Sequence, residues 1–208
     1  MKRICTGILV IPLSLTSSWH IGSYSNIRPN KVTFENNSMI INIDKSASPL
    51  IYSFDKAKKI SGFDVAGKFI GLPKLSNLSL QGEKGFDDYP LRMGIILKGD
   101  KKLSFMQKIV SPDWLKKLYS SIPANEGIDY VQFYNVTQNP AQLNTSRIHP
   151  LSSLLKENFF ALVKNDGAFS YKVKFDESLN VSGVWISSDG DDTLSKYQVI
   201  INKLDLEN

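Results

Sequence analysis

The sequence predicts an all-β protein, a single-domain β-sandwich or jelly roll with one or two short helices in its loops. From Lys31 onward, short runs rich in Val, Ile, Tyr and Phe alternate with polar residues and end at turn residues, as half-buried strands do. Helical spacing of apolar residues is rare. The 208 residues, 42% of them hydrophobic, suffice for one packed domain without disulfides, and no repeat or linker divides them.

The predicted strand at 89–97 has the clearest pattern, because its odd-numbered residues from Tyr89 to Leu97 are all apolar and share one face. In the strand at 169–175, apolar residues alternate with Lys172 and Lys174, so one face is expected to lie in water. In chain order, the predicted strands cover 39–43, 50–54, 63–70, 89–97, 129–136, 159–163, 169–175, 181–187 and 196–204.

Two short helices are predicted in loops. Ser111 suits the N-cap position, Pro112 the first helical position and Asp113 the first turn. Apolar residues then recur at helical spacing, which predicts a helix up to about Ser121. The segment 151–158 is the second candidate helix.

The N-terminus has the order of a secretory signal. Lys2 and Arg3 precede an apolar stretch at 4–15 and three small residues at 16–18. We therefore expect cleavage after Ser18, a signal peptide at 1–18 and a single β-sandwich domain at 19–208; the alternative is an ordinary buried first strand. The apolar stretch is too short to span a bilayer, so no transmembrane segment is expected in the mature chain. That chain would lack the single cysteine, Cys5, which fits a periplasmic or secreted bacterial protein.

Charge and motifs exclude several functional classes. The net charge of +5 comes mostly from lysines spread in ones and twos, without the clustered cations and stacking aromatics of a nucleic-acid surface. The only histidines are His20 and His149, which disfavours a zinc site. Signatures of zinc proteases, serine hydrolases and nucleotide-binding loops are absent. A hydrolase based on two carboxylates stays an alternative, although no Glu falls inside a predicted strand.

The first acidic segment places Asp87 and Asp88 at the start of the clearest strand. Asp88 and Arg92 share a face opposite the apolar stripe, and on an extended strand they lie roughly 13 Å apart. They therefore cannot pair directly without a bend. One interpretation is structural, with acids binding turn amides and Arg92 neutralising a facing carboxylate. The other is a polar ligand patch on the concave face of the sandwich.

The second acidic segment, with Asp189, Asp191 and Asp192, follows a hydrophobic strand. It is not an EF-hand loop, because Leu194 and Ile200 occupy the positions that require Gly and Glu. It is a solvated turn, a loop site for a cation such as Ca²⁺, or a set of acids that receives Arg92 or a lysine. We favour the salt bridge, because spaced ligands and a closing Glu are missing. The predicted ligand-binding residues are Asp87, Asp88, Arg92, Asp189, Asp191 and Asp192.

These two segments resemble a family of exported bacterial proteins. The resemblance rests on Asp87-Asp88-Tyr89 with Arg92, on Asp189, Asp191 and Thr193 after Val184-Trp185-Ile186, and on the small-residue segment 45–50. The family is the domain of unknown function number three thousand and forty-seven. The resemblance implies an exported, galactose-binding-like or carbohydrate-module-like β-sandwich with no assigned activity.

The sequence therefore predicts an exported, non-catalytic binding module for a glycan or another cell-envelope component, with no required cofactor. Its site would combine the acids with an exposed aromatic residue, for which Trp19, Trp114 and Tyr134 are candidates. The alternatives are a structural or protein-interaction sandwich without a small-molecule ligand, and the carboxylate-based hydrolase.

Overall fold

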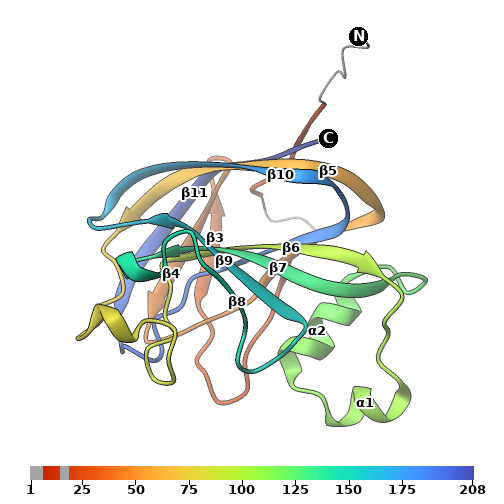
Figure 1. The fold of residues 1–208 in the computed structure, drawn as a ribbon, viewed down its shortest axis with the longest axis horizontal. Helices are drawn as coiled ribbons and strands as arrows, with labels where there is room; N and C mark the ends of the chain where they lie inside the picture. Colours follow the sequence, from red (N-terminus) through yellow and green to blue (C-terminus); the bar gives the residue numbers. More distant parts are fainter. Residues whose placement is uncertain (1–6, 15–18) are drawn as a thin grey trace.

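Two long strands form the middle of the fold. In the computed structural model, which describes residues 7–14 and 19–208, β5 (Leu50–Ile70) and β10 (Gly167–Ser187) pair antiparallel along nearly their whole length (Figure 1). The register shifts between Lys174 and Leu179 and again between Val181 and Gly183. Such irregularities bend and twist a strand pair, so the two halves of this pair belong to different layers.

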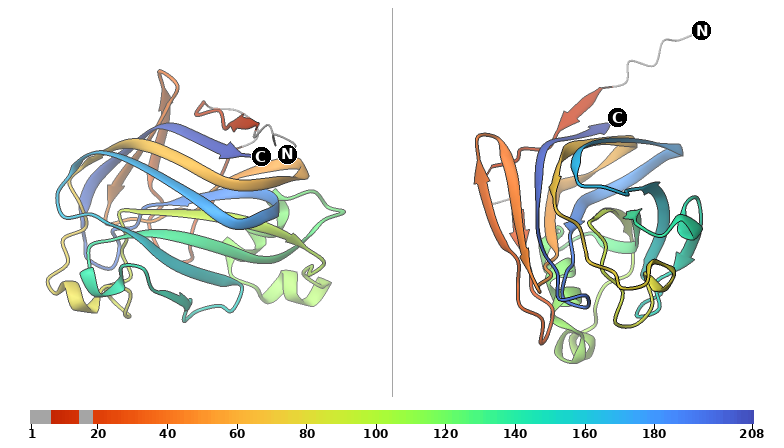
Figure 2. Two further views of the ribbon diagram at one scale, coloured as in Figure 1. Left: turned by 45° about the horizontal axis from the view of Figure 1, so that its top comes forward. Right: turned by 90° about the vertical axis from the view of Figure 1, so that its left-hand side faces the viewer.

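All described strands belong to one sheet that folds over itself (Figure 2). In the first half, the strand order is β3 (Lys31–Glu35), β4 (Ser38–Asp44), β11 (Lys196–Glu207) and the later part of β5. The short strand β1 (Ile8–Val10) pairs with the end of β11. In the second half, the strand order is the later part of β10, then β6 (Leu91–Gly99), β7 (Gly127–Thr137), β9 (Leu155–Leu162) and β8 (Ser146–Ile148). The short strand β2 (Trp19–Ile21) pairs with the beginning of β5.

The main core lies between the two halves of the sheet. Met39 and Ile41 of β4 face it from one half, and Met93 and Ile95 of β6 face it from the other; all four are buried. The alternating stripe predicted at 89–97 is therefore core on one side. The predicted all-β sandwich is confirmed.

A second apolar cluster covers one end of the outer face of the second half. Trp185 and Phe133 pack there against Leu118 of α2 (Asp113–Ser121). The Trp114 ring lies 6.0 Å from that of Trp185. The loop from β6 to β7 also carries α1 (Phe105–Val110), and two single-turn helices occur at η1 (Leu78–Leu80) and η2 (Pro140–Gln142).

The structure corrects several predicted elements. The predicted pairs 50–54 and 63–70, and 169–175 and 181–187, are single strands interrupted by register shifts. The helix predicted at 151–158 is wrong, because β9 begins at Leu155. The helix after Ser111 is confirmed as α2, but Pro112 occupies its N-cap and no side chain caps it. The helix α1 was not predicted.

Part of the predicted signal peptide lies in the sheet. Lys2, Arg3, Cys5 and the boundary at Ser18 are outside the described residues. Ile8–Val10 forms β1 on β11, and Ile11 and Leu13 are buried in the main core. The strand β1 itself leaves Ile8 and Val10 exposed, so neither interpretation of this segment is decided, and removal of residues 1–18 stays a prediction. Among the residues described, no helix is long and apolar enough to cross a membrane.

Candidate functional site

Arg92 binds three carboxylates from three separate parts of the chain. It extends from β6 toward the outer face of the second half-sheet. Its Nε lies 2.9 Å from Asp189 Oδ2, its Nη1 2.9 Å from Glu157 Oε1, and its Nη2 3.1 Å from Asp87 Oδ2. Only 7% of the Arg92 side chain is exposed. The predicted pairing of Arg92 with the second acidic segment is present in the structure.

Glu157 lies between two guanidinium groups. It is fully buried in β9, and its Oε2 is 2.6 Å from Nε of Arg147 on β8. Asn135 Nδ2 of β7 donates to Glu157 Oε1 at 2.6 Å. Arg147 Nη2 also reaches Asp87 Oδ1 at 3.3 Å. This set of ion pairs, hereafter the arginine network, ties β6, β7, β8 and β9 together on their outer face.

The two acidic segments also bind each other directly. Asp88 Oδ2 accepts a hydrogen bond from the Thr193 amide at 2.7 Å, and Asp192 Oδ2 accepts one from the Asp87 amide at 2.9 Å. Asp87 Oδ2 lies 3.2 Å from His149 Nε2. The structural interpretation, in which the acids bind turn amides, therefore describes these contacts.

Burial and neighbouring charges shift the pKa values of these acids in different directions. Burial raises the pKa of Asp189 despite the adjacent Arg92. It also raises the pKa of Asp191 to about 6, with help from the nearby Asp88 charge. For Asp87, burial alone would raise the pKa, but Arg92 and His149 hold it below its usual value.

The six predicted residues lie close together, but most of their polar groups bind one another or neighbouring protein groups. Asp192 is exposed and Asp87 and Asp191 are half-buried, so these three are the solvent-accessible members. Within the described part of the chain, no group of three or more acidic, His or Cys side chains is arranged to hold a metal ion. The Ca²⁺ alternative stays a prediction for experiment.

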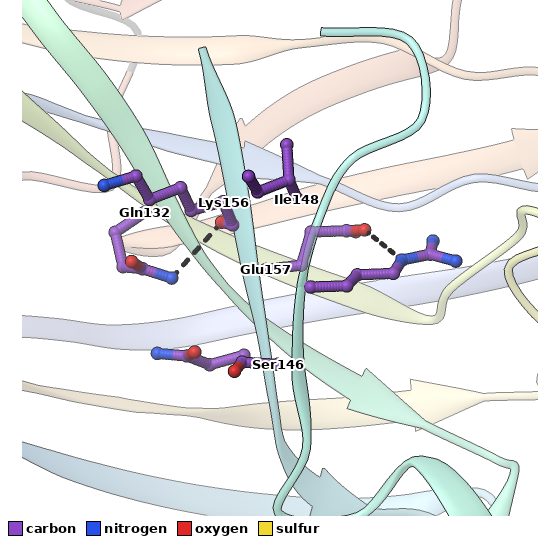
Figure 3. A pocket seen from close by; sticks show the side chains of 7 residues that line it. Gln132, Ser146, Ile148, Lys156 and Glu157 are labelled. Atoms are coloured by element: carbon purple, nitrogen blue, oxygen red, sulfur yellow. Dashed lines mark hydrogen bonds and ion pairs between the residues drawn. The ribbon is translucent and has the colours of Figure 1, made fainter. Parts of the chain in front are cut away.

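A cavity of about 260 Å³ lies at the same edge strands, and its lining includes Arg147 and Glu157 of the arginine network as well as residues of the opposite face (Figure 3). Pairing of β7 with β9 sets Gln132 beside Lys156, and pairing of β8 with β9 sets Ser146 opposite Asn158. Strand alternation sends Arg147 and Glu157 to the other face. The lining residues are Gln132, Ser146, Arg147, Ile148, Lys156, Glu157 and Asn158.

Two half-buried tyrosines continue this face along β7. Lys156 Nζ lies 3.5 Å from the centre of the Tyr130 ring. The Tyr134 ring stacks on Phe175 with centroids 5.7 Å apart, and burial raises the pKa of Tyr134 to about 12. Of the aromatic candidates, Tyr134 lies opposite the lining residue Asn158 in the pairing of β7 with β9, although it does not itself line the cavity. Tyr134 and Trp19 both pack against the main core, and Trp114 packs in the second cluster.

A second, larger cavity of about 590 Å³ lies between α2 and the segment after β2. No aromatic side chain lines it. Its lining residues are Ile21, Gly22, Ser23, Pro29, Asp113, Lys116, Lys117 and Ser120.

The sequence analysis missed the lining of the smaller cavity because it assigned 151–158 to a helix. The alternation that identifies this strand, with buried Leu155, Glu157 and Phe159 between more exposed residues, is visible only in the structure, because Glu157 is polar.

Comparisons with known proteins find no family for this chain, and the solved structures that are similar to it are only distantly so. No family model and no curated protein matches the chain, so the resemblance to the domain of unknown function stays a prediction. A solved carbohydrate-binding module of family 29 is similar, with TM-score 0.43 and 8% identity over 98% of this chain and 90% of that one. The Emp47p carbohydrate recognition domain gives TM-score 0.39 and 10% identity over 96% and 94%. A Bacillus subtilis protein of unknown function with a galectin-like fold gives 0.38 and 7% over 96% and 94%.

Proposed function

We propose that this protein is a non-catalytic glycan-binding module whose ligand occupies the cavity on β7, β9 and β8. The observation that carries the proposal is the side-chain set on that face: two amides, an ammonium and a hydroxyl beside half-buried tyrosine rings. Sugar hydroxyls need both donors and acceptors, which Gln132, Asn158 and Ser146 supply. The apolar C–H faces of a sugar ring pack well on an aromatic ring.

Side-chain contacts on both faces of β7, β8 and β9 fix the strands that carry these groups. Gln132 Nε2 donates to the Lys156 carbonyl at 3.2 Å, which links β7 to β9 on the cavity side. The Arg147–Glu157 pair fixes the short strand β8 to β9 on the other side. Because a binding site is effective when its supporting shell is rigid, the arginine network fits the role of a support for the cavity.

The non-catalytic part of the proposal is supported by the pairing of the buried acids. Glu157 and Asp87, which a carboxylate-based hydrolase would need free, each contact both Arg92 and Arg147. Arg92 and His149 hold the pKa of Asp87 below its usual value, so Asp87 is a poor proton donor.

Binding can be tested on an array of neutral and uronic-acid-containing glycans, followed by calorimetry with the best ligand. We expect Asn158→Ala and Lys156→Ala each to weaken binding by about tenfold, as loss of one good hydrogen bond does. Lys174→Ala, on an exposed part of β10, is the control. If the array is blank, or both site variants bind like wild type, the cavity is not a glycan site and the structural or protein-interaction alternative gains support.

Export is part of this proposal, since cell-envelope glycans lie outside the cytoplasm. It is supported by the basic and apolar order of residues 2–15. N-terminal sequencing of the protein from its native host should then find a start near Trp19. A soluble cytoplasmic product that begins at Met1 would contradict export and would leave Ile11 and Leu13 as core residues.

A further inference from the structure

The helix α1 carries four large apolar side chains that the described residues leave uncovered. Phe105 is 76% exposed, Met106 66%, Ile109 57% and Val110 76%. No residue of this helix is buried. Exposed apolar side chains are common singly, but four on six residues form a patch of the kind that marks an interaction site.

These four residues form one side of a locally fixed helix. Phe105 and Ile109, and likewise Met106 and Val110, are four residues apart and therefore lie on the same face. A capping box holds the first turn: Ser104 Oγ accepts from the Gln107 amide at 3.3 Å, and Gln107 Oε1 accepts from the Ser104 amide at 2.8 Å. Local hydrogen bonds, and not packing against the sandwich, therefore hold α1 in its helical conformation.

The same loop concentrates positive charge. Residues 100–122 contain five lysines (Lys101, Lys102, Lys108, Lys116 and Lys117) and two aspartates, which gives this segment a net charge of +3. The Lys101 side chain is 67% exposed although it contacts Asp129, and Lys102 and Lys108 are exposed as well. Lys101, Lys102 and Lys108 therefore lie on or directly before α1, whereas Lys116 and Lys117 belong to the following helix α2.

We propose that α1 docks this protein on an anionic lipid surface. Figure 1 shows α1 at the outer end of the loop between β6 and β7, beyond α2, where it projects from the sandwich. A projecting apolar helix flanked by lysines suits a membrane, because a bilayer accepts apolar side chains without a complementary groove. Anionic headgroups attract the lysines, and the apolar face enters the boundary between headgroups and acyl chains.

Vesicle flotation tests the proposal, with one set of vesicles of phosphatidylcholine and another of equal parts phosphatidylcholine and phosphatidylglycerol. We expect the full chain to bind the anionic vesicles at least tenfold more tightly than the neutral ones, with binding that weakens as salt rises. Phe105→Ser combined with Ile109→Ser should lower binding at least tenfold. Leu151→Ser combined with Leu194→Ser, which removes two exposed leucines elsewhere, should leave it unchanged.

A second measurement reports the position of the helix directly. Addition of anionic vesicles should shift the emission of Phe105→Trp to the blue relative to the same variant without vesicles, and brominated lipid chains should quench it more than they quench wild type. Loss of flotation by the Leu151/Leu194 control, equal flotation of the Phe105/Ile109 variant, or absence of binding would each overturn the proposal. A dimer in light scattering that disappears in the Phe105/Ile109 variant, without vesicle binding, would overturn it in favour of a protein partner. None of these outcomes depends on glycan binding.

Discussion

Arg92 of β6 and Glu157 of β9 form an ion pair of 2.9 Å although β7 lies between their strands. The Arg92 side chain passes over its neighbour on β7, Asn135, which donates to the same carboxylate oxygen. The pair therefore connects β6, β7 and β9 on the outer face of the second half-sheet, next to the second apolar cluster that α2 covers. Buried charges of this kind are strongly coupled, since removing one partner leaves the others without compensation.

Replacement of Arg92 should be among the most destabilising changes on this face. Arg92→Ala leaves Asp87, Glu157 and Asp189 without their shared cation, and we expect it to lower the free energy of unfolding by about 3–5 kcal/mol in urea denaturation. Arg28→Ala is a matched control, because Arg28 pairs with Asp44 at 3.3 Å but is 69% exposed. The control should cost less than about 1 kcal/mol. Equal effects would show that the arginine network contributes little.

Asp191 should make the protein less stable as pH rises. Its pKa is raised from 3.8 to about 6 by burial and by Asp88, so between these values the folded chain holds a proton that the unfolded chain releases. The resulting destabilisation grows through this window and is complete above about pH 6. After allowance for solvent screening it is about 1 kcal/mol, or about 2–4 °C in melting temperature.

Asp191→Asn removes this effect. The variant should therefore melt higher than wild type at about pH 7, and the difference should shrink toward about pH 4. The pKa of Asp87 is shifted in the opposite direction, so only the difference between variant and wild type isolates Asp191. A pH-independent difference would contradict the assignment.

Calcium should not stabilise this protein specifically. Arg92 already occupies the Oδ2 side of Asp189, which leaves the second acidic segment with an incomplete set of oxygen ligands. Melting should be the same in CaCl₂, in MgCl₂ and in chelator at matched ionic strength. A bound ion at about 100 times its dissociation constant would add about 2.7 kcal/mol, or roughly 5–10 °C. A calcium-specific rise of that size would establish the cation site instead.

The core stripe of β6 can be tested with one pair of variants. Met93→Ala should cost about 2–5 kcal/mol, because Met93 is buried in the main core. Lys174→Ala on the exposed face of β10 should change stability by about 0.5 kcal/mol at most. A small effect at Met93 would contradict the core assignment of this stripe, unless neighbouring core side chains move to fill the space left by the shorter side chain.

The strand stripes could be predicted from the sequence because each depends on its own residues. The period of two at 89–97 is visible without knowledge of its partners, and β6 follows it. The single strands β5 and β10 could not be predicted as such. The polar stretches within them, such as 55–59 and 176–178, have the composition of turns but lie at positions where the register of paired strands shifts. That distinction depends on residues more than a hundred positions away.

The candidate site was harder to predict for the same reason. Leucines at 151, 154 and 155 have helical spacing, which hid the strand that places Glu157 next to Arg92 and Asn158 in the cavity. The helix α1, in contrast, could have been found, because Ser104 and Gln107 have the spacing of a capping box.

The pairing of β5 with β10 also determines how the chain must fold. Residues 50–70 meet residues 167–186, and 39–44 meet 196–201, so the central strands can pair only after long loops have closed. Closing such loops costs chain entropy before the contacts form. Refolding from urea should therefore be slow for a chain of this size, on the order of milliseconds to seconds, and unpaired strand edges would persist meanwhile. A newly made copy of this protein is thus most prone to aggregate before β10 reaches β5.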